Sequence, residues 1–244
     1  MIEVRALHKS FESREVLRGV NLSVAQGSTA VILGGSGSGK TVLMKHLIGL
    51  LQPDSGEIFI EGAPIARISG HALNELRRKF GMVFQAAALF DSMTVFDNVA
   101  FPLREHTRKP ENEIARIVHE KLDIVGLRDI DAKFPAELSG GMKKRVGLAR
   151  AIALEPKIVL YDEPTTGLDP ITTDYVDEMI LDAQKKLGVT SVVISHDIGS
   201  AMNIANHIAF LHQGQICAEG TPEQMRASPH PAVATFLSTW RGKR

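Results

Sequence analysis

Hydrophobic residues follow two alternating patterns along the chain. Short continuous runs, such as Thr29–Leu33, Ile158–Asp162 and Val189–Ser195, are separated by longer segments in which hydrophobic residues recur every three to four positions. A continuous run bounded by Gly or Asp is typical of a strand that is buried on both faces of a sheet. By the same pattern we expect strands at Ile2–Leu7, Leu22–Val24, Glu57–Ile60, Phe80–Phe84, His207–Leu211 and Gln215–Glu219.

The segments with helical spacing complete an α/β fold. Strands come first and later alternate with helices, which predicts a mixed sheet core with an antiparallel N-terminal part. Residues 86–155 contain helical patterns without a convincing strand, so we expect a helical subdomain inserted there. The predicted helices are Lys40–Ile48, His71–Arg78, Val95–Leu103, Ile114–Val125, Gly141–Leu154, Thr172–Lys186, Ile198–Ala205 and Ala232–Trp240.

The composition is that of a soluble globular protein and narrows the function classes. The 244 residues carry 28 Lys and Arg and 28 Asp and Glu, and this zero net charge argues against a nucleic-acid partner bound by long-range electrostatics. No hydrophobic run approaches the ~20 residues of a membrane span, and the first ten residues lack the apolar core of a secretory signal. The single cysteine cannot form an internal disulfide and fits a reducing compartment.

The C-terminal part is expected to stand apart from the main domain. We predict that the domain spans residues 1–221 and that residues 222–244 form a helix and a short tail. Phe236 and Trp240 are expected to pack on the core. The cations Arg241, Lys243 and Arg244 are only a weak signal for contact with anionic lipid.

The clearest chemical signal is the sequence GGSGSGKT at residues 34–41. It follows a predicted strand and opens a predicted helix, which is the context of a phosphate-binding P-loop. The glycines let successive N–H groups turn toward an anion, and the helix N-terminus adds its positive dipole end. Lys40 is expected to reach the β- and γ-phosphates of ATP, and Thr41 to bind Mg²⁺. The predicted nucleotide contacts in this segment are Gly34, Gly35, Ser36, Gly37, Ser38, Gly39, Lys40, Thr41 and Val42.

Two carboxylates stand at the end of the predicted strand Ile158–Asp162. The carboxyl edge of a parallel sheet is where ligands bind in open α/β folds. We therefore predict that Asp162 acts on Mg²⁺ through water and that Glu163 is the general base for the attacking water. Taken alone, the sequence DEPTTG could equally be an ordinary acidic turn, and it is the P-loop that favours the catalytic interpretation.

The segment LSGGM at residues 138–142 lies between the P-loop and the acidic strand. It resembles the signature sequence of ABC-type ATPases, usually LSGGQ, although Met142 replaces the usual Gln. Ser139, Gly140 and Gly141 at the start of a helix would form a second anion site. In this family the signature contacts the γ-phosphate of ATP held by the other subunit. The resemblance therefore implies a P-loop NTPase of ABC type that forms a head-to-tail homodimer, with two ATP molecules at its interface.

Further positions match the ABC family in the same order along the chain. Gln85 resembles the Q-loop glutamine, which senses Mg²⁺ in the family and links the core to the helical subdomain. Asp169, in GLDP, resembles the D-loop aspartate at the dimer interface, and His196 resembles the switch histidine on the γ-phosphate. Phe11 stands where the family stacks an aromatic ring, more often Tyr, on adenine. The resemblance implies catalytic roles for Lys40, Gln85, Glu163 and His196, and metal contacts from Thr41, Gln85 and Asp162.

Residues 86–107, with the sequence AAALFDSMTVFDNVAFPLREHT, carry the most specific resemblance. Together with LSGGM and ARAIALEP, they are similar to the ATPase subunits of MCE-linked, Mla-type phospholipid transport systems. In ABC transporters this region forms a groove that receives a helix of the permease. Phe90 and Met93 are the candidates for that contact, whereas most other hydrophobic residues of the segment are expected in the core of the subdomain.

The resemblance also implies a setting for the protein. It would be a peripheral subunit on the cytoplasmic face of a bacterial inner membrane, with ATP and Mg²⁺ as cofactors. The implied partners are a second copy, a permease dimer, an MCE-domain lipid-binding protein and a small STAS-domain protein, and the implied cargo is phospholipid moved between the inner and outer membranes. Two alternatives stay open: an ABC ATPase for another cargo, such as organic solvents or small solutes, and a regulatory ABC ATPase that moves no cargo.

Overall fold

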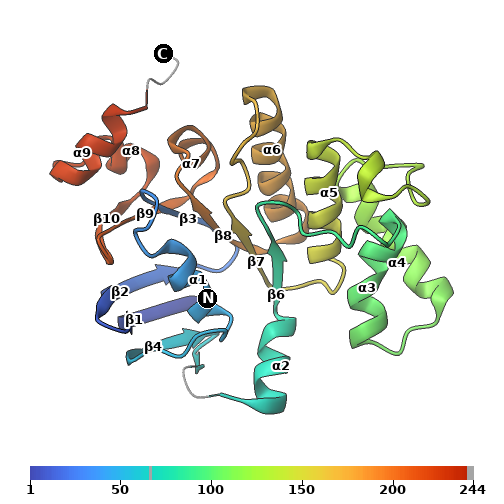
Figure 1. The fold of residues 1–244 in the computed structure, drawn as a ribbon, viewed down its shortest axis with the longest axis horizontal. Helices are drawn as coiled ribbons and strands as arrows, with labels where there is room; N and C mark the ends of the chain where they lie inside the picture. The colour runs from blue at the N-terminus through green and yellow to red at the C-terminus, as the bar shows by residue number, and fades with distance from the viewer. Residues whose placement is uncertain (66–67, 241–244) are drawn as a thin grey trace.

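The computed structural model describes residues 1–65 and 68–240 (Figure 1). Its main sheet has six strands in the order β10-β9-β3-β8-β7-β6. The strands from β9 to β6 run parallel, and β10 pairs antiparallel with β9. The bounds are β3 Thr29–Leu33, β6 Phe80–Val83, β7 Ile158–Asp162, β8 Thr190–Ser195, β9 His207–His212 and β10 Gln215–Gly220.

A smaller sheet precedes and flanks the main one. It is antiparallel, in the order β2-β1-β4-β5, and confirms the antiparallel N-terminal part that the sequence predicts. Helix α1 (Lys40–Leu47) packs between the sheets, because Leu43, Met44 and Leu47 are buried together with residues of both. The strands of this sheet are β1 Ile2–Phe11, β2 Arg14–Val24, β4 Ser55–Ile60 and β5 Ala63–Pro64.

The central strand β3 is buried on both faces. Val31 and Leu33 belong to one hydrophobic cluster, while Ala30 and Ile32 belong to the other, since successive side chains of a strand point to opposite faces. This double burial explains why the strand is a continuous hydrophobic run. The carboxyl ends of β3, β8 and β7 lie side by side, so the segments that follow these three strands converge at one edge.

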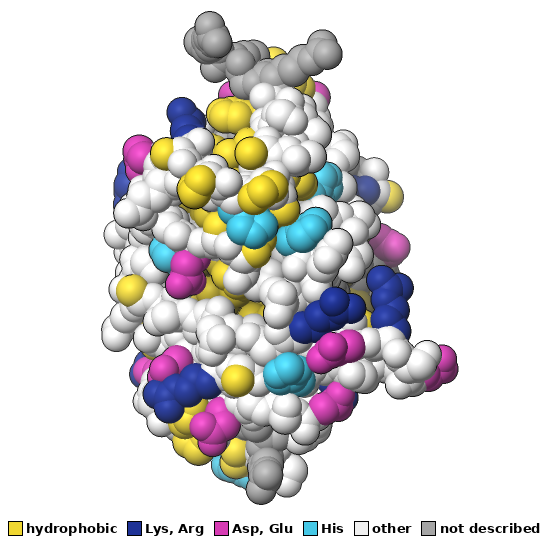
Figure 2. All heavy atoms as spheres, turned by 90° about the vertical axis from the view of Figure 1, so that its left-hand side faces the viewer, with side chains coloured by type: hydrophobic (Ala, Val, Ile, Leu, Met, Phe, Trp, Pro, Cys, Tyr) yellow, Lys and Arg dark blue, Asp and Glu magenta, His cyan; other side chains and the backbone are white. Residues whose placement is uncertain are grey.

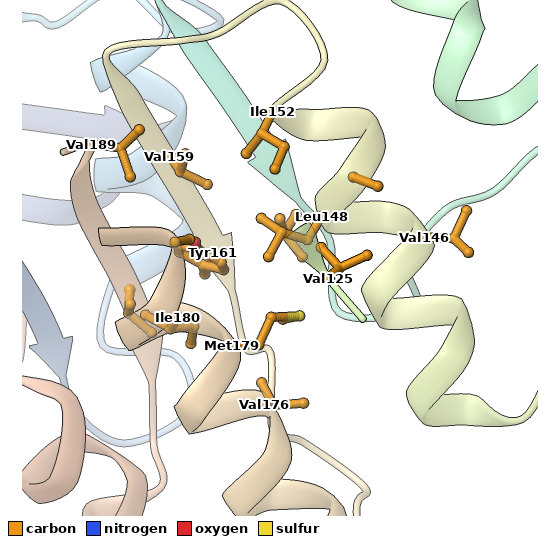
Figure 3. Close-up of a cluster of buried hydrophobic side chains, with 14 of the residues drawn as sticks. Val125, Val146, Leu148, Ile152, Val159, Tyr161, Val176, Met179, Ile180 and Val189 are labelled. Carbon is orange, nitrogen blue, oxygen red and sulfur yellow. The ribbon is translucent and has the colours of Figure 1, made fainter. Parts of the chain in front are cut away.

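The segment between β6 and β7 forms a helical subdomain, in agreement with the predicted fold class. It contains helices α3 (Val95–His106), α4 (Glu111–Ile124) and α5 (Gly140–Ala151), and a 3₁₀ turn at Pro135–Glu137. Helix α5 packs toward β7 and helix α6 (Pro170–Leu187), and the hydrophobic side chains between them are drawn in Figure 3. These include Leu148 and Ile152 of α5, Val159 and Tyr161 of β7, and Val176, Met179 and Ile180 of α6.

The remaining helices are α2 (Gly70–Arg78), α7 (Ile198–Ile204), α8 (Pro222–Arg226) and α9 (Pro231–Ser238). Phe236 and Trp240 pack against the main hydrophobic cluster, as predicted. The predicted tail cations Arg241, Lys243 and Arg244 lie outside the described residues. Within residues 1–65 and 68–240, no helix combines the length and the hydropathy that crossing a membrane requires.

The sequence missed several short or polar elements. The strand β5, the 3₁₀ turn and helix α8 have between two and five residues, too few to show a hydrophobic period. Strands β1 and β2 extend beyond their predicted ends into a hairpin whose tip is polar and exposed. Figure 2 shows this side of the molecule, where acidic and basic side chains are interspersed and hydrophobic side chains gather near the C-terminal end.

Candidate nucleotide site

The P-loop connects β3 to α1, and two of its glycines lie where another chain segment approaches closely. A Cβ atom on Gly34 would lie 2.3 Å from the carbonyl oxygen of Leu211, and one on Gly39 would lie 2.9 Å from the side chain of Leu17. Gly39 also has a φ of 109°, a conformation that favours glycine. Around Gly35 and Gly37, by contrast, no described atom lies within 4 Å of such a Cβ. Neighbouring segments therefore hold the loop in place at Gly34 and Gly39, whereas at Gly35 and Gly37 the loop faces open space.

The P-loop lines a cleft of about 880 Å³. Four segments that follow separate strands meet there, because these parallel strands end at the same edge of the main sheet. Thr41 comes from the P-loop, Gln85 from the segment after β6, Glu163 from the segment after β7 and His196 from the segment after β8. The predicted site residues that line the cleft are Phe11, Gly35, Ser36, Gly37, Gly39, Lys40, Thr41, Val42, Gln85, Glu163 and His196.

The Lys40 ammonium group is held inside the cleft. Its side chain is only 7% exposed, and Nζ donates to the carbonyl oxygens of Gly34 and Gly35 at 2.8 and 3.0 Å. Among the described residues, the buried Oγ of Ser38 has no hydrogen-bond partner. It lies beside Gly34, on the side of the loop that Leu211 also approaches, and Ser38 does not line the cleft. The fixed cation and the open glycine loop together fit a polyphosphate ligand.

Glu163 is the most connected carboxylate of the cleft. Its Oε1 lies 3.4 Å from Nζ of Lys40, and its Oε2 accepts from Nδ1 of His196 at 2.7 Å and from the hydroxyl of Thr166 at 3.1 Å. The residue has a φ of 49°, a left-handed conformation that is costly for a side chain with a Cβ. Its N–H donates to the carbonyl oxygen of Ile194 in β8, which helps to hold this conformation.

Asp162 ends strand β7 directly before Glu163 and is half-buried. Burial raises the pKa of the Asp162 carboxyl, and the neighbouring Glu163 carboxylate raises it further, while Lys40 and Lys45 act in the opposite direction. A bound cation would favour the ionised carboxyl. Thr41 and Gln85 line the cleft, whereas Asp162 does not, although it directly precedes Glu163, which does. All three side chains carry oxygen atoms of the kind that Mg²⁺ prefers as ligands.

The residues of the signature sequence lie elsewhere in the same chain. Ser139 caps the N-terminus of helix α5 and accepts a hydrogen bond from the N–H of Met142 at 3.2 Å. Asp169 caps α6 in the same manner, through the N–H of Thr172. Ser139, Gly140, Gly141 and Asp169 line a second cavity of about 890 Å³ that shares no lining residue with the nucleotide cleft.

The segment after Gln85 has an unusual backbone. Ala87 and Ala88 are consecutive residues with φ values of 61° and 47°, which is uncommon outside glycine. The guanidinium group of Arg150, on helix α5, donates to the carbonyl oxygens of both alanines at 2.8 Å. Helix α5, which begins at the signature sequence, therefore holds the segment that leads away from Gln85.

A third cavity, a groove of about 600 Å³, is lined in part by Ala88 of this segment. Phe90 lines the groove and is 42% exposed, so its side chain is accessible to the partner that the sequence predicts, whereas Met93 is half-buried and does not line the groove. Val95 and Val99 are buried in the core of the subdomain, as expected. The apolar side chains that line the groove include Phe80, Phe84, Phe90, Phe101, Pro102 and Leu154. The basic side chains that line it include Arg77, Arg78 and Arg150.

Sequence reasoning missed some residues of the nucleotide cleft. Arg14 and Val16 line it from strand β2, and Thr166 lines it from the turn after Glu163. Phe236 and Thr239 reach it from α9 and the residue after that helix. No local motif marks Arg14, Val16, Phe236 and Thr239, because they come from a hairpin whose polar ends resemble a loop or from the far end of the chain. Thr166 lies within the turn DEPTTG, where its hydrogen bond to Glu163 could not be read from the sequence.

The comparisons with known proteins agree with this geometry. The model of the ABC transporter family matches residues 17–166, and the chain belongs to that family. It is an ATP-hydrolysing ABC subunit with the fold that its sequence predicts.

Two relatives are similar over nearly their full length. The chain is 45% identical over 237 residues to the intermembrane phospholipid transport system ATP-binding protein MlaF of Haemophilus influenzae, covering 97% of this chain and 90% of the relative. It is 42% identical to MlaF of Escherichia coli, covering 97% and 88%. The predicted resemblance to Mla-type ATPases is thus confirmed.

Other similar proteins carry different names. A probable ribonucleotide transport ATP-binding protein, mkl, of Mycobacterium leprae is 45% identical over 97% of this chain and 68% of the relative. Among solved structures, cbiO1 of Clostridium perfringens, part of an ABC transporter complex, matches with a TM-score of 0.87 at 30% identity, covering 98% of this chain and 95% of that one. The ATP-binding cassette MJ0796, a dimer bound to ADP and Pi, matches with a TM-score of 0.82 at 30% identity, covering 91% and 99%.

Proposed function

We propose that this chain powers the movement of phospholipid between the inner and outer membranes of a bacterium, as the ATPase subunit of a membrane complex. The observation that carries the proposal is the 45% identity to MlaF of Haemophilus influenzae over 97% of this chain and 90% of that protein. The two proteins are similar from end to end, including the groove segment at residues 86–107, so the similarity extends beyond the nucleotide motifs that all ABC ATPases share.

The P-loop would bind the triphosphate of ATP. Lys40, already buried and aimed at the loop carbonyls, would exchange those partners for phosphate oxygens. Phe11 lies 42% exposed on the wall of the cleft, where its ring face is available for stacking on adenine. Mg²⁺, held by Thr41, Gln85 and Asp162, would supply charge compensation for the phosphates.

Glu163 would act as the general base in hydrolysis. It is positioned by three partners, the Lys40 ammonium group, the His196 imidazole and the Thr166 hydroxyl. A carboxylate held this way can accept the proton of a water molecule that attacks the γ-phosphorus. His196 would stabilise the charge that develops on the γ-phosphate oxygens, since its imidazole is 52% exposed on the cleft side of Glu163.

A second copy would complete the site. Ser139, Gly140, Gly141 and Asp169 line a cavity apart from the cleft of their own chain, so a nucleotide bound in that cleft would meet them only on another copy. The MJ0796 cassette, which is similar over 91% of this chain, is a dimer bound to ADP and Pi. A head-to-tail homodimer with ATP between the P-loop of one copy and the signature of the other accounts for both cavities.

The groove beside the Gln85 segment would receive a helix of the permease dimer. Its apolar floor suits the hydrophobic side of such a helix, and the surrounding Arg77, Arg78 and Arg150 favour an acidic residue on it. The complex would further contain an MCE-domain lipid-binding protein and a small STAS-domain protein. This assembly would place the chain at the cytoplasmic face of the inner membrane.

Purification of the tagged chain from its native membranes tests the proposal. We expect a permease and an MCE-domain protein to co-purify, phospholipid to be found in the complex by mass spectrometry, and the reconstituted complex to transfer labelled phospholipid between vesicles when ATP is supplied. Recovery of a complex that transfers no lipid but carries ribonucleotide, as the name of the mycobacterial relative suggests, would favour the small-solute alternative. A complete complex that hydrolyses ATP and moves no cargo would favour the regulatory one.

A further inference from the structure

Asp177 is a buried carboxylate for which the nucleotide site has no use. It lies in the middle of α6, and its residue is only 4% exposed. Its Oδ1 accepts a hydrogen bond from the hydroxyl of Ser200, which is itself 2% exposed, and its Oδ2 lies 3.4 Å from the amide nitrogen of Asn203. Both partners belong to α7, which packs beside α6 (Figure 1). One carboxylate therefore joins the two helices.

Helix α7 begins next to the switch histidine. Asp197, which follows His196, caps the helix by accepting from the N–H of Ser200 at 3.1 Å. The other carboxylate oxygen of Asp197 lies 3.4 Å from the hydroxyl of Thr165, two residues after Glu163. Ser200 thus binds Asp177 through its side chain and Asp197 through its backbone. A continuous series of hydrogen bonds connects α6 to the turn that carries His196.

The burial of a charge at this position is unfavourable in itself. The pKa of Asp177 is raised to about 6, chiefly by burial and to a smaller extent by the nearby carboxylates Asp197 and Asp174. The hydrogen bonds from Ser200 and Asn203 act in the opposite direction. An asparagine has the same shape without the charge. Both oxygens of the carboxylate face donors on α7, the Ser200 hydroxyl and the Asn203 amide, so this side chain holds the two helices together.

We propose that Asp177 is a positioning residue that fixes α7 on α6 and so holds His196 against Glu163. Helix α6 begins at Asp169, on the cavity that would face the second copy. The series of bonds therefore runs from that surface to the switch histidine, and a shift of α6 on dimerisation would reach His196. The inference rests on the proposed role of His196 in hydrolysis.

The test compares stability with turnover in the ATPase complex. Asp177→Asn removes the buried charge and weakens the bond to Asn203, so we expect a higher Tm at pH 7.5 and an unchanged KM for ATP. We expect kcat to fall by up to about 10²-fold, the loss that a misplacement of about 1 Å can cause. The control is Lys185→Gln on the same helix, which removes an exposed charge at a residue that lines neither the nucleotide cleft nor the second cavity. It should change neither Tm nor kcat. A residue with a merely structural role would lose stability and activity together.

A double-mutant cycle with His196→Ala separates the inference from the proposed function. In single-turnover measurements, Asp177→Asn should slow hydrolysis in the wild-type background and have no further effect once His196 is absent. If His196→Ala alone hydrolyses ATP at the wild-type rate, the proposed role of His196 fails. If His196→Ala is slow but Asp177→Asn leaves kcat unchanged, or lowers it equally in both backgrounds, the inference about Asp177 is overturned and the proposed function stands.

Discussion

The nucleotide cleft differs in its side-chain contacts from the signature surface, the part of the second cavity that Ser139, Gly140, Gly141 and Asp169 line. In the cleft, Lys40, Glu163 and His196 are already joined by contacts of 2.7 to 3.4 Å before any ligand is considered. On the signature surface, the hydrogen bonds of Ser139 and Asp169 cap only their own helices, and both residues are exposed on a cavity that the cleft does not share. The cleft is organised within one chain, whereas the signature surface would gain a ligand only from the second copy of the proposed homodimer. This difference is the one that the proposed composite active site requires.

The largest effect is expected from Glu163→Gln. The glutamine keeps the shape of the side chain but cannot accept a proton from water, so turnover should fall by roughly 10²–10⁴-fold, as for the loss of a general base. ATP binding should persist, and the ATP-bound dimer should accumulate. Turnover by the purified complex and light scattering with ATP check this prediction. A wild-type turnover rate would show that Glu163 is not the base.

The next effect concerns binding within one copy. Lys40→Ala removes the buried ammonium group that faces the phosphates, and the loss of a charge-assisted contact of about 1.5–3 kcal/mol should weaken ATP binding by roughly 10- to 100-fold. Lys45→Ala, one turn further along α1 and exposed, is the matched control and should bind ATP normally. Titration of a fluorescent ATP analogue measures both. Equal affinities for the two variants would contradict the P-loop assignment.

Ser139→Ala probes the other side of the comparison. It should leave ATP affinity of the isolated chain unchanged and lower the turnover of the assembled complex by about tenfold, because the hydroxyl would act only on a nucleotide held by the partner. The substitution also removes a helix cap worth about 1 kcal/mol. Thr94→Ala removes the comparable cap of α3 and serves as the control for stability. Normal turnover of the Ser139 variant would remove the argument for a composite site.

The smallest effect is a pH dependence of stability at Asp177. The folded-state pKa of about 6 is above the ordinary value of 3.8, so the folded protein binds more protons than the unfolded one between these values. The contribution of this group to stability therefore increases as pH falls from above 6 toward 4. Asp177→Asn should raise the free energy of unfolding by about 1–2 kcal/mol at pH 7.5 and much less at pH 4.5. Urea unfolding at the two pH values measures the difference, and an equal effect at both would contradict the raised pKa.

Most residues of the cleft could be predicted from the sequence because each lies in a short segment directly after a strand. The P-loop, Glu163 and His196 each follow a buried strand, and parallel strands bring their carboxyl ends to one edge. The contributions of Arg14, Phe236 and Thr239 were not predictable, since they depend on how a hairpin and the C-terminal helix pack on that edge. The bonds of Asp177 with Ser200 and Asn203 were missed for the same reason: they join two helices through tertiary packing, and a single Asp in a helix pattern reads as an exposed residue.

Phe90 and Met93 show the same limit in the helical subdomain. The hydrophobic period distinguishes Val95 and Val99, which are buried, from polar positions. It cannot tell which hydrophobic residue near the end of a segment faces outward. Phe90 lines the groove and Met93 does not, because Asn98 binds the backbone of both residues and folds the chain there into a tight turn.

A mixing experiment tests the composite site most directly. One variant carries Lys40→Ala and the other carries Ser139→Glu, which places a negative charge where the partner's γ-phosphate would lie. At an ATP concentration near the wild-type Kd, each should have little activity alone. When differently tagged copies are assembled into mixed dimers with the permease, one intact site forms per dimer, from the P-loop of the Ser139 variant and the signature of the Lys40 variant. The account predicts ATPase activity in the mixed dimers well above that of either variant. Mixed dimers no more active than the single variants would contradict it.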